Sequence, residues 1–252
     1  MSGHSKWSTI KHQKGAADAK RGQLFTRLTK EIVIAAKAGG GDPDMNPRLR
    51  LAVQQARQNN MPLDNITRAI KRATGQSDDQ ADLEELVYEG FSPGGAAILV
   101  VAVTDNRNRA SSEVRNVFDR NNGKMGQVGS VGWMFEQKGV ITLQLAEEQT
   151  EEAELLAIEH GAEDISDDDA TIEVRTAPEN FEAVRKALEE AGMAPVSAEV
   201  TLVPTTQTGL DERAAEQTLK LLDRLEGLDD VQKVVTNADF PEAVLDKYAT
   251  AA

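Results

Sequence analysis

Apolar positions in the first third of the chain recur every three or four residues, which is the spacing of one face of an α-helix. Leu24, Leu28 and Ile32 follow this spacing, and "AGGGDPD" (38–44) ends the segment with glycines. Asn46 then provides an N-cap for a second helix, with Pro47 in its first turn. The pattern therefore predicts two successive amphipathic helices before residue 60.

A third helical segment follows "NNMP" (59–62) and stops at Gly75. Ile66, Ala69 and Ile70 form its apolar face. Three short helices with brief connections predict a small antiparallel bundle. The polar stretch "GQSDDQAD" (75–82) is then expected to be a linker.

After this linker, the spacing of apolar residues changes from that typical of helices to that typical of strands. "LVYEGF" and "AAILVVAVT" flank the turn "SPGG" (92–95), which predicts a hairpin with a buried second strand. "ASSEVRNVFDRNN" (110–122) is expected to be a helix and "VGWMFEQ" (131–137) another strand.

An internal repeat begins at residue 140, and its second copy begins at residue 171. "VITLQL" (140–145) corresponds to "TIEVRT" (171–176), and "LLAIEHGAEDIS" (155–166) corresponds to "KALEEAGMAPVS" (186–197). Each copy has the pattern strand, helix, strand. Two tandem copies predict the split βαβ, or ferredoxin-like, arrangement.

A helix at 211–226 and a strand at 230–237 follow the repeat without a nearby partner. We expect them to complete the sheet begun by residues 83–138. The predicted fold is α+β: an N-terminal three-helix domain followed by two α/β ferredoxin-like domains, one inserted in the other. The predicted parts are a basic arm (1–20), a helical domain (21–76), a discontinuous α/β domain (83–138 plus 206–246) and an inserted βαββαβ domain (139–205).

Composition narrows the class of protein. Apolar residues make up 40% and charged residues 28% of the 252 residues, as in ordinary globular chains. There is no cysteine, so disulfides, thiol catalysis and cysteine metal sites are excluded. The start "MSGHSKW" has no apolar signal core, and the run "AAILVVAV" (96–103) is too short to span a membrane. We expect a cytoplasmic protein without a membrane partner.

Charge is divided unevenly along the chain. Residues 1–75 hold 14 Lys and Arg against 5 Asp and Glu, a net charge of +9, whereas residues 76–252 carry −23. Such asymmetry favours a polyanion as the partner of the basic part. The alternative is that the acidic part simply docks against the basic part.

The candidate contact residues are basic and concentrate near the N-terminus. At 100° per residue, the cations of the first helix lie on the face opposite its apolar residues, and Glu31 is the only acid in that segment. Trp7 could stack on a base or could anchor the arm to the bundle. The candidates in the arm and first helix are Lys6, Trp7, Lys11, Lys14, Lys20, Arg21, Arg27, Lys30 and Lys37.

A second candidate is "TDNRNR" (104–109), where a buried strand gives way to a helix. Backbone N–H groups at a helix N-terminus suit phosphate, and Arg107 and Arg109 add positive charge. The alternative is that these two arginines pair with the chain's many carboxylates.

Other motifs predict no chemistry. The glycine-rich segment "GKMGQVGSVG" (123–132) is expected to be a flexible surface loop, and "DISDDDA" (164–170) the tip of a hairpin. The three histidines do not form a metal set, and P-loop and H-E-x-x-H motifs are absent. We therefore expect neither catalysis nor a metal, cofactor or small-molecule substrate, and we expect a monomer.

Six blocks in a fixed order closely resemble the YebC family, which includes the mitochondrial translational activator of cytochrome oxidase subunit I. They are "GHSKW", "IKHQKGAADAKRGQLFTRLTKEI", "GGGDPDMNPRLR", "NNMPLDNITRAI", "YEGFSPGG" and "TDNRNR". The resemblance runs from residue 3 to about residue 240.

This resemblance implies a helical N-terminal domain followed by two α/β domains. It also implies a role in gene expression, either as a DNA-binding transcriptional regulator or as a translation factor that assists ribosomes through difficult stretches such as consecutive prolines. The implied partner is nucleic acid, either DNA or ribosomal RNA within the ribosome.

Overall fold

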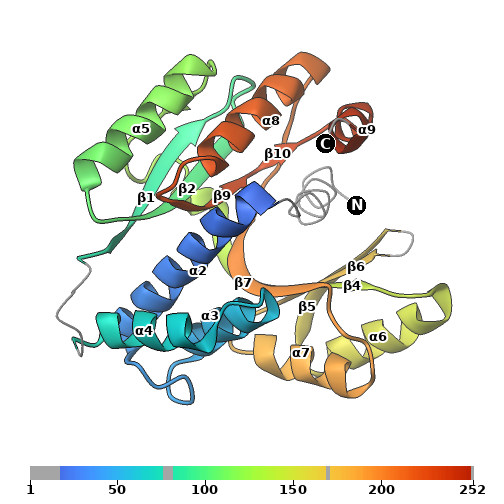
Figure 1. Cartoon of the computed structure of the whole chain (residues 1–252). Helices are drawn as coiled ribbons and strands as arrows, with labels where there is room; N and C mark the ends of the chain where they lie inside the picture. Colours follow the sequence, from blue (N-terminus) through green and yellow to red (C-terminus); the bar gives the residue numbers. More distant parts are fainter. Residues whose placement is uncertain (1–17, 76–81, 169–170, 251–252) are drawn as a thin grey trace.

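The computed structural model describes residues 18–75, 82–168 and 171–250, which form three parts (Figure 1). The first part is a helical bundle. The second is a four-stranded sheet that contains the hairpin of residues 84–104, and the third is another four-stranded sheet. Labels follow Figure 1, so the first described helix is α2. The expected class, α+β with helices first and two sheet domains after them, is confirmed.

The helical bundle forms because each of its helices has one apolar face. Its members are α2 (Asp18–Gly39), α3 (Pro47–Gln58) and α4 (Leu63–Ala73). Ile32, Leu49 and Ile66 are almost fully buried in the shared core. Asn46 caps α3 as predicted, because its side chain accepts a hydrogen bond from the Leu49 N–H at 3.1 Å.

The first sheet has the strand order β3-β1-β2-β9, and all its neighbouring strands are antiparallel. Its strands are β1 (Glu84–Phe91), β2 (Ala97–Thr104), β3 (Lys124–Met125) and β9 (Val231–Thr236). β9 pairs with β2, so the late strand returns to the early hairpin as the sequence predicts.

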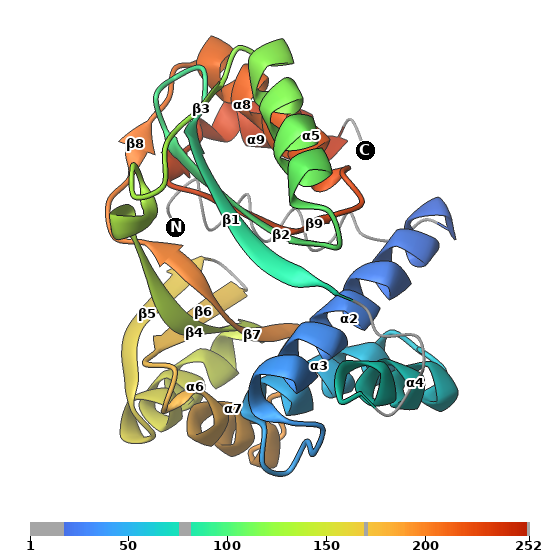
Figure 2. The same ribbon diagram turned by 90° about the vertical axis from the view of Figure 1, so that its left-hand side faces the viewer.

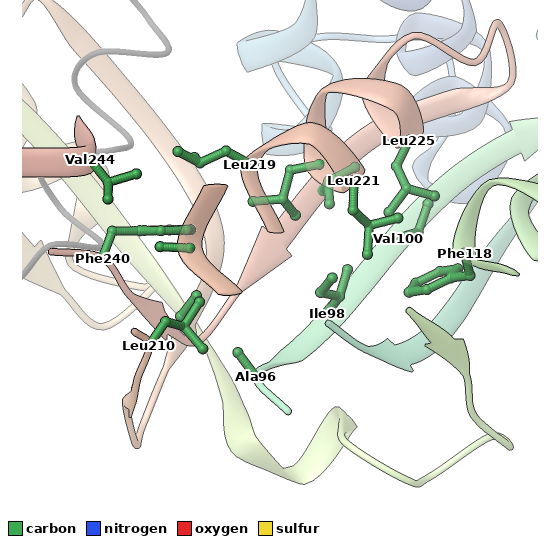
Figure 3. Packing of buried hydrophobic residues seen from close by; sticks show 14 of the residues in the cluster. Ala96, Ile98, Val100, Phe118, Leu210, Leu219, Leu221, Leu225, Phe240 and Val244 are labelled. Atoms are coloured by element: carbon green, nitrogen blue, oxygen red, sulfur yellow. The ribbon is translucent and has the colours of Figure 1, made fainter. Parts of the chain in front are cut away.

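Helices α5 (Arg107–Arg120) and α8 (Glu212–Glu226) cover one face of the first sheet (Figure 2). Figure 3 shows the core between them: Ile98 and Val100 of β2 meet Phe118 of α5 and Leu221 of α8. Three further elements lie beside this core: β8 (Thr208–Gly209), β10 (Ala238–Asp239) and α9 (Glu242–Thr250). β8 precedes α8 in the sequence, β10 follows β9, and the two short strands pair in parallel.

The second sheet has the order β5-β6-β4-β7, which is the order of a ferredoxin-like βαββαβ unit. Its strands are β4 (Phe135–Gln144), β5 (Ala162–Asp168), β6 (Thr171–Thr176) and β7 (Ser197–Pro204), and its helices are α6 (Glu147–Glu159) and α7 (Phe181–Glu190). β4 and β6, the first strands of the two repeats, pair directly with each other.

One strand prediction is wrong in part: residues 135–137 do lie in a strand, but in the second sheet, and residues 131–134 do not. The segment 131–137 does not form a strand of the first sheet. Instead, Gly132–Met134 is a single 3₁₀ turn, and β4 then runs unbroken from Phe135 to Gln144 in the second sheet. The Met134 N–H closes this turn on the Val131 carbonyl oxygen, and the Val131 and Gly132 N–H groups bond the Glu89 carboxylate, so they are not available to a ladder. We therefore propose residues 135–204, in place of 139–205, as the inserted domain.

Candidate nucleic-acid interface

Two of the predicted cations on α2 face the turn between α8 and β9. The Arg27 guanidinium donates a hydrogen bond to the Glu226 carbonyl. The Lys30 ammonium lies 2.8 Å from a carboxylate oxygen of Asp230 and 3.0 Å from the Asp229 carbonyl oxygen. Only 14% of the Lys30 side chain is exposed. This part of the basic face therefore packs against the first sheet domain, as in the docking alternative.

Asp230 also receives a second predicted cation. Its other carboxylate oxygen lies 2.8 Å from Arg109 Nη2 and 2.9 Å from the Thr104 hydroxyl. Burial alone would raise the pKa of Asp230, but the hydrogen bonds from Lys30, Arg109 and Thr104 outweigh it and lower the pKa. Lys30 and Arg109, which come from different helices distant in the sequence, thus share one buried carboxylate.

The start of α5 is capped from within the chain. The Asn106 side chain accepts a hydrogen bond from the Arg109 N–H at 3.1 Å, and Arg109 also pairs with Asp105 at 2.8 Å. Arg107 differs from Arg109, because its side chain is exposed and has no hydrogen bond or ion pair with any described residue. Arg109 pairs with carboxylates, whereas Arg107 remains available to a ligand.

Lys37 lies at the end of α2 and contacts the chain entering β1. Its ammonium lies 3.2 Å from the Leu83 carbonyl oxygen and 3.9 Å from Asp82. Lys20 and Arg21 lie in the first turns of α2, but the structure does not describe their side chains. The arm residues Lys6, Trp7, Lys11 and Lys14 lie outside the described residues.

The bundle also exposes cations that the sequence argument missed. Arg57 in the last turn of α3, and Arg68 and Lys71 on α4, are exposed, and no described residue bonds or pairs with their side chains. A helical wheel of α4, at 100° per residue, would have identified Arg68 and Lys71, since they lie opposite Ile66 and Ala69.

A surface groove of about 600 Å³ runs beside α3 and is lined in part by Arg50, Gln54 and Arg57. The Arg50 guanidinium is fixed at 2.9–3.0 Å by the carbonyl oxygens of Pro43 and Asp44. Two guanidinium groups and an amide thus face one hollow. Their N–H groups can donate to anionic or carbonyl oxygens.

Metal chemistry finds no support in the described part of the chain. Among those residues, no three His, Asp or Glu side chains gather as potential metal ligands. None of the helices in the described ranges is long and apolar enough to cross a membrane.

Comparison with known proteins places these features in one family. Residues 5–76 match the family described as "TACO1/YebC protein N-terminal domain", and residues 83–238 match "TACO1/YebC second and third domain". A "probable transcriptional regulatory protein" of Geotalea uraniireducens is 55% identical over 98% of this chain and 99% of its own length. A protein of the same name from Treponema pallidum is 54% identical over 97% of this chain and 100% of its own length.

A solved structure agrees with the fold. The crystal structure of a conserved hypothetical protein from Aquifex aeolicus is 44% identical and superposes with a TM-score of 0.83. The match covers 92% of this chain and 96% of the other.

Proposed function

The chain belongs to the TACO1/YebC family, and from this premise we propose that it is a non-enzymatic, nucleic-acid-binding regulator of gene expression. Its curated relatives bear the name "probable transcriptional regulatory protein", which favours DNA as the nucleic acid. The protein would contact the phosphate backbone through its N-terminal part.

The observation that carries the proposal is the set of bundle cations without carboxylate partners. Arg57, Arg68 and Lys71 are exposed in a chain with a net charge of −14 and therefore an excess of carboxylates. Lysine and arginine side chains that neutralise phosphates release counterions, and this release supplies most of the sequence-independent affinity for nucleic acid. The acidic remainder repels a polyanion, so most phosphate contacts would lie at the basic end.

The proposed contact surface keeps some of the residues predicted from the sequence, omits others and adds three. It keeps the arm residues Lys6, Trp7, Lys11 and Lys14, together with Lys20, Arg21 and Arg107, and it adds Arg57, Arg68 and Lys71. We assign Arg27, Lys30, Lys37 and Arg109 to contacts within the protein, because each bonds a carbonyl or carboxylate oxygen of its own chain.

A salt titration tests the proposal. Changing Arg57, Arg68 and Lys71 together to alanine removes up to three phosphate contacts. The slope of log Kobs against log salt concentration is expected to flatten by about 2 to 3 units, since each contact contributes about 0.9 on duplex DNA and 0.7 on single strands. Affinity should fall similarly for unrelated sequences, because phosphate contacts do not read bases.

The matched control changes Arg115, Arg213 and Lys220 to alanine, which removes the same charge from exposed positions of α5 and α8. An equal loss in both variants would mean that only net charge matters, and no loss in the bundle variant would contradict the proposed surface. The titration should use duplex DNA and a structured RNA of equal length. Binding confined to the RNA would contradict a DNA-binding role and would favour translation.

A further inference from the structure

The glycine-rich segment between β3 and β4 is held by one buried side chain. Glu89 of β1 is 7% exposed, and its carboxylate accepts hydrogen bonds from the backbone N–H groups of Gly129, Val131 and Gly132 at 2.6, 2.6 and 2.9 Å. The Ser130 hydroxyl lies 3.4 Å from the same carboxylate. This anchoring differs from the flexible loop that the sequence suggested.

Backbone geometry in this loop favours glycine at one place and close packing favours it at another. Gly129 has a φ of +85°, which side chains rarely adopt. A Cβ on Gly126 would lie 2.4 Å from the Ser130 hydroxyl oxygen, so a side chain there would force Ser130 to move. A buried carboxylate costs free energy unless several donors satisfy it. Glu89 has these donors, so it holds the loop in one shape.

That shape presents two large apolar side chains to solvent. Trp133 is 69% exposed and Val128 is 92% exposed. The Trp133 indole N–H donates to the Ser130 carbonyl at 3.3 Å, which orients the ring relative to the anchored loop. Because the ring is already oriented, little conformational entropy is lost when a flat ligand covers it.

Polar side chains of the loop and of the segments that flank it indicate the kind of ligand. The Lys124 side chain, on β3 just before the loop, is exposed and has no hydrogen bond or ion pair with any described residue. Gln127 and Thr205 are exposed and uncharged, and Thr205 bonds the Met134 carbonyl next to Trp133. An open aromatic face, one cation and amide or hydroxyl groups match an unpaired nucleotide, which offers a base to stack and a phosphate to neutralise.

We infer that Trp133 is a stacking platform for an unpaired base of a nucleic acid, with Lys124 of the adjoining strand β3 to neutralise a phosphate of the same ligand. This inference rests on the proposed function. Figure 2 shows the chain between β3 and β4 on the opposite side of the view from α4. A nucleic-acid strand that contacts both α4 and this loop must cross the molecule. A duplex offers no open base faces along its length, so only an unpaired segment can stack on Trp133. The loop therefore gives the protein a preference for nucleic acids with single-stranded segments.

The chain supplies its own reporter for this inference, because Trp7 and Trp133 are its only tryptophans. In a Trp7→Phe background, a single-stranded oligonucleotide should quench the Trp133 emission, and a blunt duplex of the same sequence should not. Affinity is measured separately from the anisotropy of a labelled oligonucleotide. Trp133→Ala is expected to weaken single-strand binding by about 5- to 150-fold, the range found for stacked bases, and to leave duplex binding unchanged.

Val128→Ala is the matched control, since it removes the other exposed apolar side chain of the same loop. It should leave single-strand affinity unchanged. Equal losses from Trp133→Ala and Val128→Ala would contradict stacking and would favour an apolar protein-docking patch. If anisotropy reports binding of the single strand but the Trp133 emission does not change, the stacking inference is wrong and the proposed function is unaffected. Absence of binding to any oligonucleotide would overturn both.

Discussion

Changing Asp230 to alanine is expected to lower the free energy of unfolding by about 3 kcal/mol, the cost of breaking a buried ion pair by removing one partner. The variant leaves the Lys30 side chain, which is 14% exposed, with no carboxylate, and it also removes one of the two carboxylate partners of Arg109 and the acceptor of the Thr104 hydroxyl. The loss should be concentrated at the contact between α2 and the first sheet. We expect the bundle to separate from that sheet more readily than either unfolds.

Thermal or urea unfolding measures this loss, and hydrogen exchange of α2 locates it. Asp229→Ala is the control, because it removes the same charge from an exposed neighbour whose side chain has one long hydrogen bond, 3.4 Å, from Gln23. Similar destabilisation by both changes would show that charge near the turn matters, and not the buried contact.

The same carboxylate makes a pH-dependent contribution. Its folded-state pKa is lowered, so the stabilisation is fully present above the unfolded pKa, about 3.9, and is lost as the pH falls through the folded value. The difference in stability between wild type and Asp230→Asn should therefore be constant from pH 7 to about 5 and shrink below about 4. A difference that grows on acidification would contradict this assignment.

Changing Glu89 to alanine should release the glycine-rich loop. Three backbone N–H groups lose their acceptor, and the Val131 N–H is buried where water cannot replace it. Each buried donor left without a partner costs about 1–3 kcal/mol, so we expect a loss of about 2–3 kcal/mol once the less buried N–H groups gain water. Burial raises the folded-state pKa of Glu89, but its four hydrogen bonds lower that pKa on balance. The ionised side chain therefore stabilises the fold above its unfolded-state pKa, and the variant should lose this stabilisation there.

Hydrogen exchange is the measurement of choice for this change. The Gly129, Val131 and Gly132 amides should exchange at least tenfold faster in the variant, since a loss of about 1.4 kcal/mol already corresponds to a factor of ten in an equilibrium constant. Glu136→Ala is the control, because its exposed carboxylate pairs only at 3.5 Å with Lys138 among the described residues. Unchanged protection in Glu89→Ala would show that the loop keeps its shape without the carboxylate.

Local periodicity was enough to predict the helices of the bundle and the strands and helices of the second sheet. Apolar spacing located α2, α3 and α4, and Asn46 marked the start of α3 correctly. The internal repeat predicted the second sheet, because two tandem strand–helix–strand units pair in the ferredoxin-like order. The strand predicted at 230–237 lacked a partner nearby in the sequence, and it does pair with β2.

The candidate site was harder to predict, because its contacts are distant in the sequence. Lys30 and Asp230 are 200 residues apart, and a helical wheel shows a basic face but not the carboxylate that covers it. The partners of Glu89 are backbone N–H groups, which no residue type identifies. The expected strand at 131–137 begins only at Phe135, and the Val131 and Gly132 N–H groups that would have extended it bond the Glu89 carboxylate instead.

The pairing of β2 with β9, on either side of the second sheet in the sequence, also sets an order of events during synthesis. The hairpin β1–β2 leaves the ribosome early, but β9, the neighbour of β2, follows only after the proposed inserted domain (135–204). At about 5–20 residues per second, β2 therefore keeps an open hydrogen-bonding edge for several seconds, while α8 is still missing from its apolar face. The inserted domain needs only contiguous chain, so it can fold first. The nascent protein thus spends part of its synthesis with an edge that invites mispairing, and slow translation after residue 204 would prolong that interval.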